Sequence, residues 1–199
     1  MKSALLLGIA LAGLLPAETL QQGERDRAMS HLHVTRKMFL DSLEGVSAAQ
    51  WAWKPSPEVW SVAEVAEHIA LSEDMLMGLV KKVVAGPAAT AEQKAEAKGK
   101  DEFVLKALVD RSKKAQAPEP LKPTNKWKTK EELIAAFKKS RDNTISYVQT
   151  TADDLRGHAT PHPVFKQLDG YQWVLLISGH AERHILQLQE VKAMSGFPK

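Results

Sequence analysis

The sequence predicts an all-α fold, a four-helix bundle in which a long crossover joins the second and third helices. Three observations lead to this prediction. Four long segments carry apolar residues at helical spacing. Three of these segments open with a capping box, in which a Ser, Thr or Asp is followed three residues later by Glu or Gln. No stretch of the 199 residues alternates apolar and polar residues as a strand of any length would.

The first helix is expected over residues 23–46. Its apolar residues Leu32, Phe39, Leu43 and Val46 keep the spacing of one helical face. This face is expected to pack against the other three helices, because a single amphipathic helix must bury its apolar stripe against a partner.

The second helix is expected to begin after Ser61. Ser61 and Glu64 form the first capping box, and Trp60 before the cap can act as a hydrophobic staple. The helix should end at Gly86-Pro87, because neither residue continues a helix well.

A long connection, residues 86–128, separates the second helix from the third. It contains an Ala/Lys/Glu stretch that is polar all round, a short expected helix over residues 101–113, and the extended spacer APEPLKP. The third helix opens with a box of Thr129 and Glu132 and runs to about Tyr147. A crossover of this length need not join adjacent antiparallel helices.

The fourth helix begins after Asp169, with Gln172 completing its capping box, and runs to Met194. Its segment SGHAERHILQLQE places His180 and His184 about 40° apart around the axis and about 6 Å apart along it. Both therefore lie in the stripe that faces the core. This spacing can present two imidazole nitrogens to one metal ion. The alternative is a pair of partly buried histidines bonded to backbone groups or carboxylates.

His68 of the second helix can supply a third ligand. Three histidines from two helices match a metal site that keeps one position open for water. Alternatively, His68 is a histidine at the boundary of the core.

Composition limits the chemistry further. The net charge of +3 is spread along the chain with no basic run, so no nucleic-acid partner is expected. The chain has no cysteine, which excludes disulfides, thiolate metal sites and a cysteine nucleophile.

The N-terminus predicts export. Lys2 and the free amine precede the uncharged, mostly apolar residues 4–15, which are too few to span a membrane. We expect a signal peptide over residues 1–17 and a mature domain over residues 23–195, periplasmic or extracellular and without stable membrane insertion. The alternative is an uncleaved N-terminal anchor.

Two segments, WAWKPSPEVWSVAEVAEHIA and DGYQWVLLISGHAERHILQLQEV, closely resemble the DinB-like superfamily of bacterial four-helix-bundle proteins. The resemblance covers residues 25–191. It implies a divalent metal on three histidines, at the positions of His68, His180 and His184. It also implies an activity such as metal-dependent hydrolysis or thiol-dependent S-transfer. Export would place the chain where small thiols are scarce, which argues against S-transfer.

Other residues are weaker candidates for the site. Glu64 lies one turn before the histidine of the second helix and can serve as a general base or orient that imidazole, although a capping role alone explains it. His162, and less directly His158, can line the mouth of a pocket before the fourth helix, or can face solvent. His31 and His33 diverge by about 200° on a helix and cannot share a metal.

The resulting hypothesis is an exported metal-dependent hydrolase that activates water on three histidines and acts on a small-molecule substrate. Its catalytic candidates are Glu64 and His162. Zn²⁺ is the expected ion, with Ni²⁺, Cu²⁺ or Fe²⁺ as alternatives. The competing hypotheses are a non-catalytic bundle pinned by metal, a small-ligand-binding protein and a thiol-dependent S-transferase. The oligomeric state, monomer or homodimer, stays open.

Overall fold

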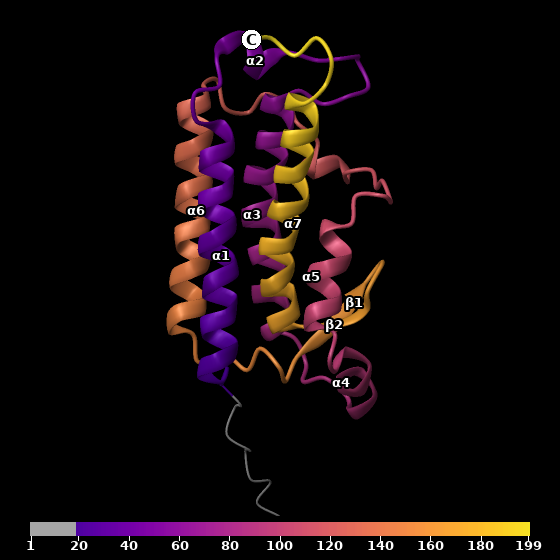
Figure 1. Ribbon diagram of the computed structural model, residues 1–199. Helices are drawn as coiled ribbons and strands as arrows, with labels where there is room; N and C mark the ends of the chain where they lie inside the picture. The colour runs from indigo at the N-terminus through magenta and orange to yellow at the C-terminus, as the bar shows by residue number, and fades with distance from the viewer. Residues whose placement is uncertain (1–18) are drawn as a thin grey trace, which may run out of the picture.

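The computed structural model describes residues 19–199, so the predicted signal peptide over residues 1–17 lies outside the described residues. Four long helices lie side by side (Figure 1): α1 (Gln22–Leu43), α3 (Val62–Val84), α6 (Lys130–Thr150) and α7 (Gly170–Lys192). Helices α1 and α7 run in one direction and α3 and α6 in the other, and each of α1 and α3 packs against both α6 and α7. Among the described residues, no helix has the length and apolar character needed to cross a membrane.

The remaining elements are short. They are α2 (Ala48–Ala52), α4 (Ala91–Ala97), α5 (Asp101–Val109), the 3-10 helix η1 (Glu119–Leu121), β1 (Ala159–His162) and β2 (Lys166–Asp169). The mostly helical content agrees with the predicted all-α class. The expectation of no strand was wrong for β1 and β2, which form an antiparallel hairpin that pairs Thr160 with Leu168. Each strand has only four residues, and Lys166 adopts a positive φ of 60° at the turn.

The helix starts follow the predicted capping residues closely. The Ser61 hydroxyl accepts the Glu64 N–H at 3.1 Å, and the Glu64 carboxylate accepts the Ser61 N–H at 2.8 Å. Asp169 forms the corresponding box with Gln172 at the start of α7. At α6 the box is incomplete, because the Glu132 carboxylate accepts the N–H of Lys128 instead.

The first helix ends at Leu43, three residues before the predicted end. Gly45 has a φ of +67°, outside the helical region, and it turns the chain away from α1. Val46 is nevertheless buried, as its place in the apolar pattern predicts.

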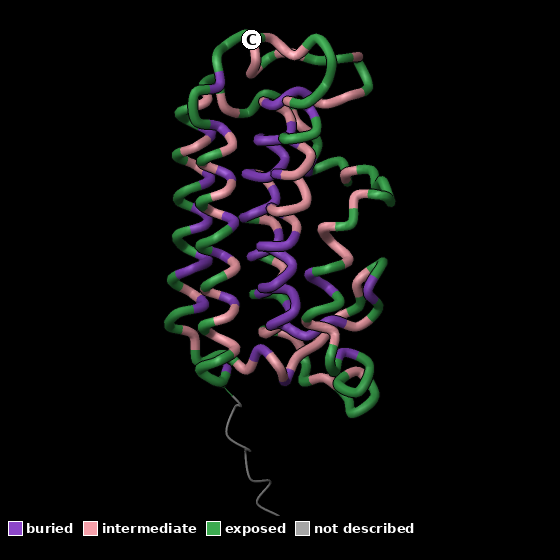
Figure 2. Tube along the Cα trace, in the orientation of Figure 1, coloured by how far each residue is buried: buried purple, intermediate pink, exposed green. Residues whose placement is uncertain are grey.

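A buried polar layer divides the core between two apolar clusters, and buried positions line the inner faces of the four long helices (Figure 2). The layer consists of Thr35, Ser72, Glu73, Ser140, Arg141, Thr144 and Ser178. At its centre the guanidinium of Arg141 donates to both oxygens of Glu73 at 2.6 and 2.7 Å, and the two side chains are 0% and 1% exposed. Arg141 also donates to the Thr35 hydroxyl and the Leu32 carbonyl of α1. The layer therefore ties together α1, α3 and α6.

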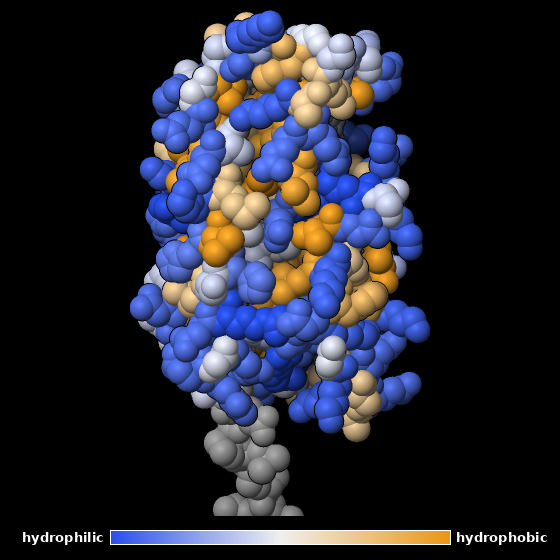
Figure 3. Space-filling model, viewed as in Figure 1, coloured by the Kyte–Doolittle hydropathy of each residue, from blue (hydrophilic) through white to orange (hydrophobic). Residues whose placement is uncertain are grey.

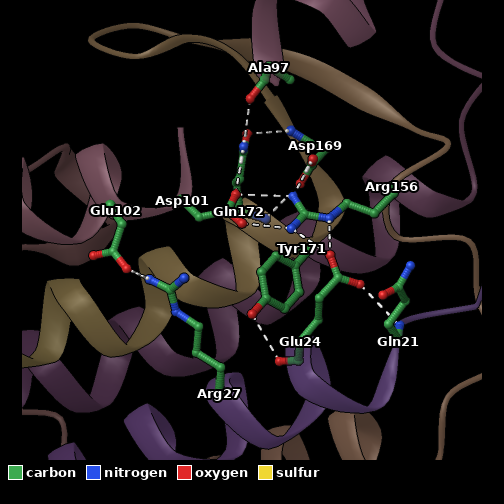
Figure 4. A network of polar contacts seen from close by, with 10 residues as sticks. All are labelled: Gln21, Glu24, Arg27, Ala97, Asp101, Glu102, Arg156, Asp169, Tyr171 and Gln172. Carbon is green, nitrogen blue, oxygen red and sulfur yellow. Dashed lines mark hydrogen bonds and ion pairs between the residues drawn. The ribbon is translucent and has the colours of Figure 1, made fainter. Parts of the chain in front are cut away.

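A second polar network fixes the start of α7 (Figure 4). Arg156 pairs with Glu24 of α1, Asp101 of α5 and the capping residue Asp169, at 2.7 to 2.8 Å. Its guanidinium lies over the ring of Tyr171, 4.2 Å from the centroid. Burial raises the pKa of Asp169 to about 6 against the opposing effect of Arg156. These contacts hold the N-terminal end of α7 against α1 and α5.

The crossover between α3 and α6 follows α7 and then reaches α3. Helix α5 packs along α7, where a Cβ at Gly179 would lie 2.8 Å from the side chain of Leu108. Arg183 of α7 donates to the carbonyls of Leu108, Asp110 and Lys113. The chain then passes to η1, which contacts α3. The crossover thus covers one side of the α3–α7 pair.

Candidate metal centre

The three predicted histidines meet between α3 and α7. The Nε2 atom of His68 lies 3.3 Å from Nε2 of His180 and 3.1 Å from Nε2 of His184. All three residues can direct a ligand atom to one point, and they form the only such group of three metal-ligating side chains in residues 19–199. Helical periodicity explains the convergence, because His180 and His184 occupy one face of α7 and His68 points toward it from α3.

Hydrogen bonds at the outer ring nitrogens determine which nitrogens are free to bind. Nδ1 of His68 lies 2.9 Å from the Leu121 carbonyl oxygen, and Nδ1 of His184 lies 2.8 Å from the side-chain oxygen of Gln187. Both oxygens can only accept, so each Nδ1 carries the proton and each Nε2 has a lone pair. The two Nε2 lone pairs therefore face each other at 3.1 Å with no proton between them.

This arrangement suits a cation. Zinc–nitrogen bonds of about 2.0–2.1 Å in a tetrahedral site place neighbouring nitrogens about 3.3–3.4 Å apart. The observed separations of 3.1 and 3.3 Å are close to that value. Three neutral imidazoles also leave the fourth position of a tetrahedron to another ligand. The residues present therefore fit a divalent ion.

Burial keeps the three rings neutral. Burial lowers the pKa of His184 to about 3, with a further contribution from His68 and smaller ones from Arg111 and Arg183. Burial is also the main cause that holds the pKa of His180 well below its usual value, and it lowers that of His68 against the effect of the Leu121 carbonyl. Neutral imidazole is the form that binds metal, so the site needs no proton release near neutral pH.

Glu64 lies in the first turn of α3, where both of its carboxylate oxygens have partners. One carboxylate oxygen accepts the Ser61 N–H, and the other pairs with Lys54 at 2.9 Å. Within the described chain no hydrogen bond joins Glu64 to the three histidines. The structure thus shows its capping role directly.

His162 lies on β1, apart from the three histidines. Its Nδ1 accepts the N–H groups of Val164 and Phe165 at 3.1 and 3.2 Å, and its ring packs against Phe165 and Trp173. Trp173 precedes His180 by seven residues, or about 10 Å along α7. Burial lowers the pKa of His162. Its ring therefore stabilises the hairpin.

The other histidines also lie elsewhere. Nδ1 of His158 lies 3.1 Å from the Pro87 carbonyl oxygen. His31 and His33 sit on α1, half-buried and exposed respectively, and neither joins the group.

Sequence reasoning missed the role of Glu67. This side chain is only 5% exposed, and its carboxylate accepts three consecutive N–H groups from Thr124, Asn125 and Lys126, at 2.9 to 3.0 Å. A glutamate beside His68 in the apolar stretch VAEHIA was a signal of an unusual environment. Its partners are backbone groups of a distant loop, which no side-chain pattern reveals.

Comparison with known proteins agrees with this geometry. The model of the family described as the DinB superfamily matches residues 31–188, a range that contains all three histidines. The chain is also similar to an uncharacterized protein of Bacillus subtilis, YuaE, with 27% identity over 164 residues, which cover 82% of this chain and 96% of YuaE. No solved structure matches the chain significantly.

Proposed function

The chain belongs to the DinB superfamily, and from that premise and the geometry of the three histidines we propose that it is an exported hydrolase that depends on a divalent metal. The proposed ligands are His68, His180 and His184. The observation that carries the proposal is the convergence of three imidazole Nε2 atoms, with that of His68 3.3 Å from His180 and 3.1 Å from His184. We assign the four long helices to the four-helix bundle predicted from the sequence.

The residues of the chain have separate parts in this proposal. Leu121 and Gln187 fix the proton on the outer nitrogens of His68 and His184, which leaves the inner nitrogens free for the ion. When bound, such an ion lowers the pKa of water and polarises carbonyl groups. Zn²⁺ is the ion we propose, because three imidazoles with one free position are typical of catalytic zinc sites.

The proton-transfer roles of Glu64 and His162 stay predictions. Glu64 would have to leave Lys54 and the Ser61 N–H to reach the histidines, and His162 is held by the hairpin amides. The lack of a general base bonded to the three histidines within residues 19–199 favours a second candidate function. In this alternative the metal only pins α3 to α7.

The experiment begins with metal content. Elemental analysis of mature protein, purified without an affinity tag or chelator, should give one divalent ion per chain. His68→Ala, His180→Ala and His184→Ala should each abolish tight binding, whereas His31→Ala on α1 should not. Protein that holds no stoichiometric metal, and takes none up, would overturn the proposal.

A panel of chromogenic carboxylic and phosphate esters separates the two candidates. Turnover that disappears on chelation and returns with Zn²⁺ supports the hydrolase. Stoichiometric metal without turnover of any ester supports the structural role.

Export is tested separately. The apolar run after Lys2 motivates it, and N-terminal sequencing of periplasmic or secreted protein should begin between residues 13 and 20. Soluble cytoplasmic protein with Met1 intact would contradict export.

A further inference from the structure

We propose that Glu67 is a positioning residue for His68 and acts through the crossover. Glu67 holds the turn that places the Leu121 carbonyl against Nδ1 of His68. The crossover then contributes to the metal centre by supplying the carbonyl that fixes the proton of His68. This inference rests on the proposed metal binding for its effect on affinity, although the placement of the His68 proton can be tested without metal.

The first step is the attachment of the turn to α3. Three consecutive N–H groups, from Thr124, Asn125 and Lys126, converge on the two oxygens of the Glu67 carboxylate. Asn125 adopts a positive φ of 58°, which curls the backbone so that these groups point to one anion. The Thr124 hydroxyl adds a longer contact of 3.4 Å.

The second step leads from the turn to the histidine. Only Lys122 and Pro123 separate Thr124 from Leu121, and the proline ring fixes one backbone angle of this short link. The buried Leu121 carbonyl lies 2.9 Å from Nδ1 of His68. Glu67 and His68 are successive residues of α3. They therefore bind two points of one short segment.

The backbone N–H groups of the turn do not need the Glu67 carboxylate as a hydrogen-bond acceptor. Thr124, Asn125 and Lys126 are themselves exposed, so water could satisfy their N–H groups. Burying the carboxylate is costly unless it is well bonded. What the carboxylate adds is a fixed position of the turn relative to α3, and hence a fixed acceptor for the His68 proton.

The consequence concerns the protonated nitrogen of His68. With the Leu121 carbonyl in place, Nδ1 holds the proton and Nε2 faces His180 and His184 with its lone pair. Without it, the proton can move to Nε2, where it blocks the ligand position. Loss of a comparable supporting contact in metal sites typically costs 10- to 100-fold in affinity.

Variants on both sides of the contact test the inference. Glu67→Gln removes the charge with little change of shape. Asn125→Val disturbs the turn without touching α3, because a β-branched residue does not tolerate a positive φ. Asn125→Gly is the matched control, since glycine adopts this conformation freely. Glu119→Gln is a second control, because Glu119 is exposed and its ion pair within residues 19–199 is with Lys122 of the same crossover.

Two measurements are made on every variant. Competition with a chromogenic chelator gives the Kd for Zn²⁺, and ¹⁵N spectra of the imidazole rings in metal-free protein show which nitrogen of His68 carries the proton. We expect Glu67→Gln and Asn125→Val each to weaken Zn²⁺ binding by about 10- to 100-fold. Both should also move part of the His68 population to the Nε2-protonated form. The variant that carries both Glu67→Gln and Asn125→Val should bind Zn²⁺ no more weakly than the weaker-binding single variant, because both changes break one chain of contacts. Both controls should keep the parent values.

The outcomes separate the two proposals. A lower Tm in Glu67→Gln with unchanged Kd and unchanged His68 protonation would mean that Glu67 serves stability alone, and the inference would fail. Should Glu67→Gln not fold, Asn125→Val against Asn125→Gly gives the same decision. If the parent protein binds no Zn²⁺, the proposed function fails, and the His68 spectra of metal-free protein still decide the role of Glu67.

Discussion

Replacing Arg141 by methionine tests the buried polar layer most directly. Arg141→Met keeps much of the apolar volume of the side chain but removes four hydrogen bonds, two of them to Glu73. The Glu73 carboxylate, only 1% exposed, would then lie in the core without a counter-ion. A buried charge without a partner is among the most costly defects in a protein.

The expected loss of unfolding free energy is about 3–5 kcal/mol, the range for a buried pair that has lost one member. In a chain of this size about 1 kcal/mol corresponds to 2–4 °C, so Tm should fall by roughly 6–20 °C. The matched control is Arg36→Met. Arg36 also joins α1 to α6, through Asp142, but the side chains of that pair are 28% and 57% exposed. Its loss should therefore cost about 0–1 kcal/mol.

Urea denaturation and calorimetry of metal-free protein measure both variants. A loss of unfolding free energy in Arg141→Met no larger than in Arg36→Met would refute the role of the buried ion pair. A second arm adds Glu73→Leu to Arg141→Met. Because apolar replacement of a whole buried pair is often neutral or stabilising, the double variant should regain most of the lost free energy. No recovery in the double variant would mean that packing, rather than the stranded carboxylate, causes the loss.

Three further predictions concern the histidines and Glu64. Metal-free protein should lose stability as pH falls from about 6.5 toward 3, because the unfolded chain then binds protons at histidines whose folded pKa is lowered. Protonation of buried Asp169 stabilises the folded state below about pH 6 and so acts in the opposite direction. The histidine contribution is therefore measured as the difference in the slope of unfolding free energy against pH between the parent and His184→Ala. Equal slopes would contradict the prediction. If the ring of His162 only stabilises the hairpin, His162→Ala should keep metal content and turnover; a loss of turnover with metal retained would establish the predicted catalytic role. Glu64→Gln keeps the capping box but removes the Lys54 pair and a negative charge at the start of α3, so it should cost about 0.5–1 kcal/mol with metal content unchanged, and loss of metal would contradict this.

Features that depend on residues close in sequence were predictable. Ser61 with Glu64, and Asp169 with Gln172, mark helix starts because each box is formed by residues three positions apart. His180 and His184 share a face for the same reason. To predict His68 as the third ligand required a further assumption, that α3 and α7 are neighbours and that His68 lies opposite His180 and His184 along the bundle.

Features that depend on distant backbone groups were not predictable. Glu67 bonds amides 57 to 59 positions away, and His68 bonds a carbonyl 53 positions away. Every residue has such groups, so sequence carries no mark of which ones are used. The hairpin escaped detection because Pro161 and the short strands give no alternating pattern, and its position is fixed by contacts with α4 and α7.

The polar layer and the three histidines lie at neighbouring levels of the fold. His68 precedes Ser72 of the layer by one turn, and His180 follows Ser178 by two residues. Since α3 and α7 are antiparallel, both offsets point the same way along the fold. Apolar faces tolerate small shifts of one helix along another, whereas a bidentate ion pair does not, so the layer fixes the level of α3 relative to α1 and α6. Because α7 packs on α1 and α3, the layer is suited to set the level of His68 against the α7 ligands indirectly. If it does so, Zn²⁺ should raise the Tm of Arg141→Met less than that of Arg36→Met, because weaker binding gives a smaller shift at equal metal concentration. Equal shifts would show that the layer stabilises the fold without placing the histidines.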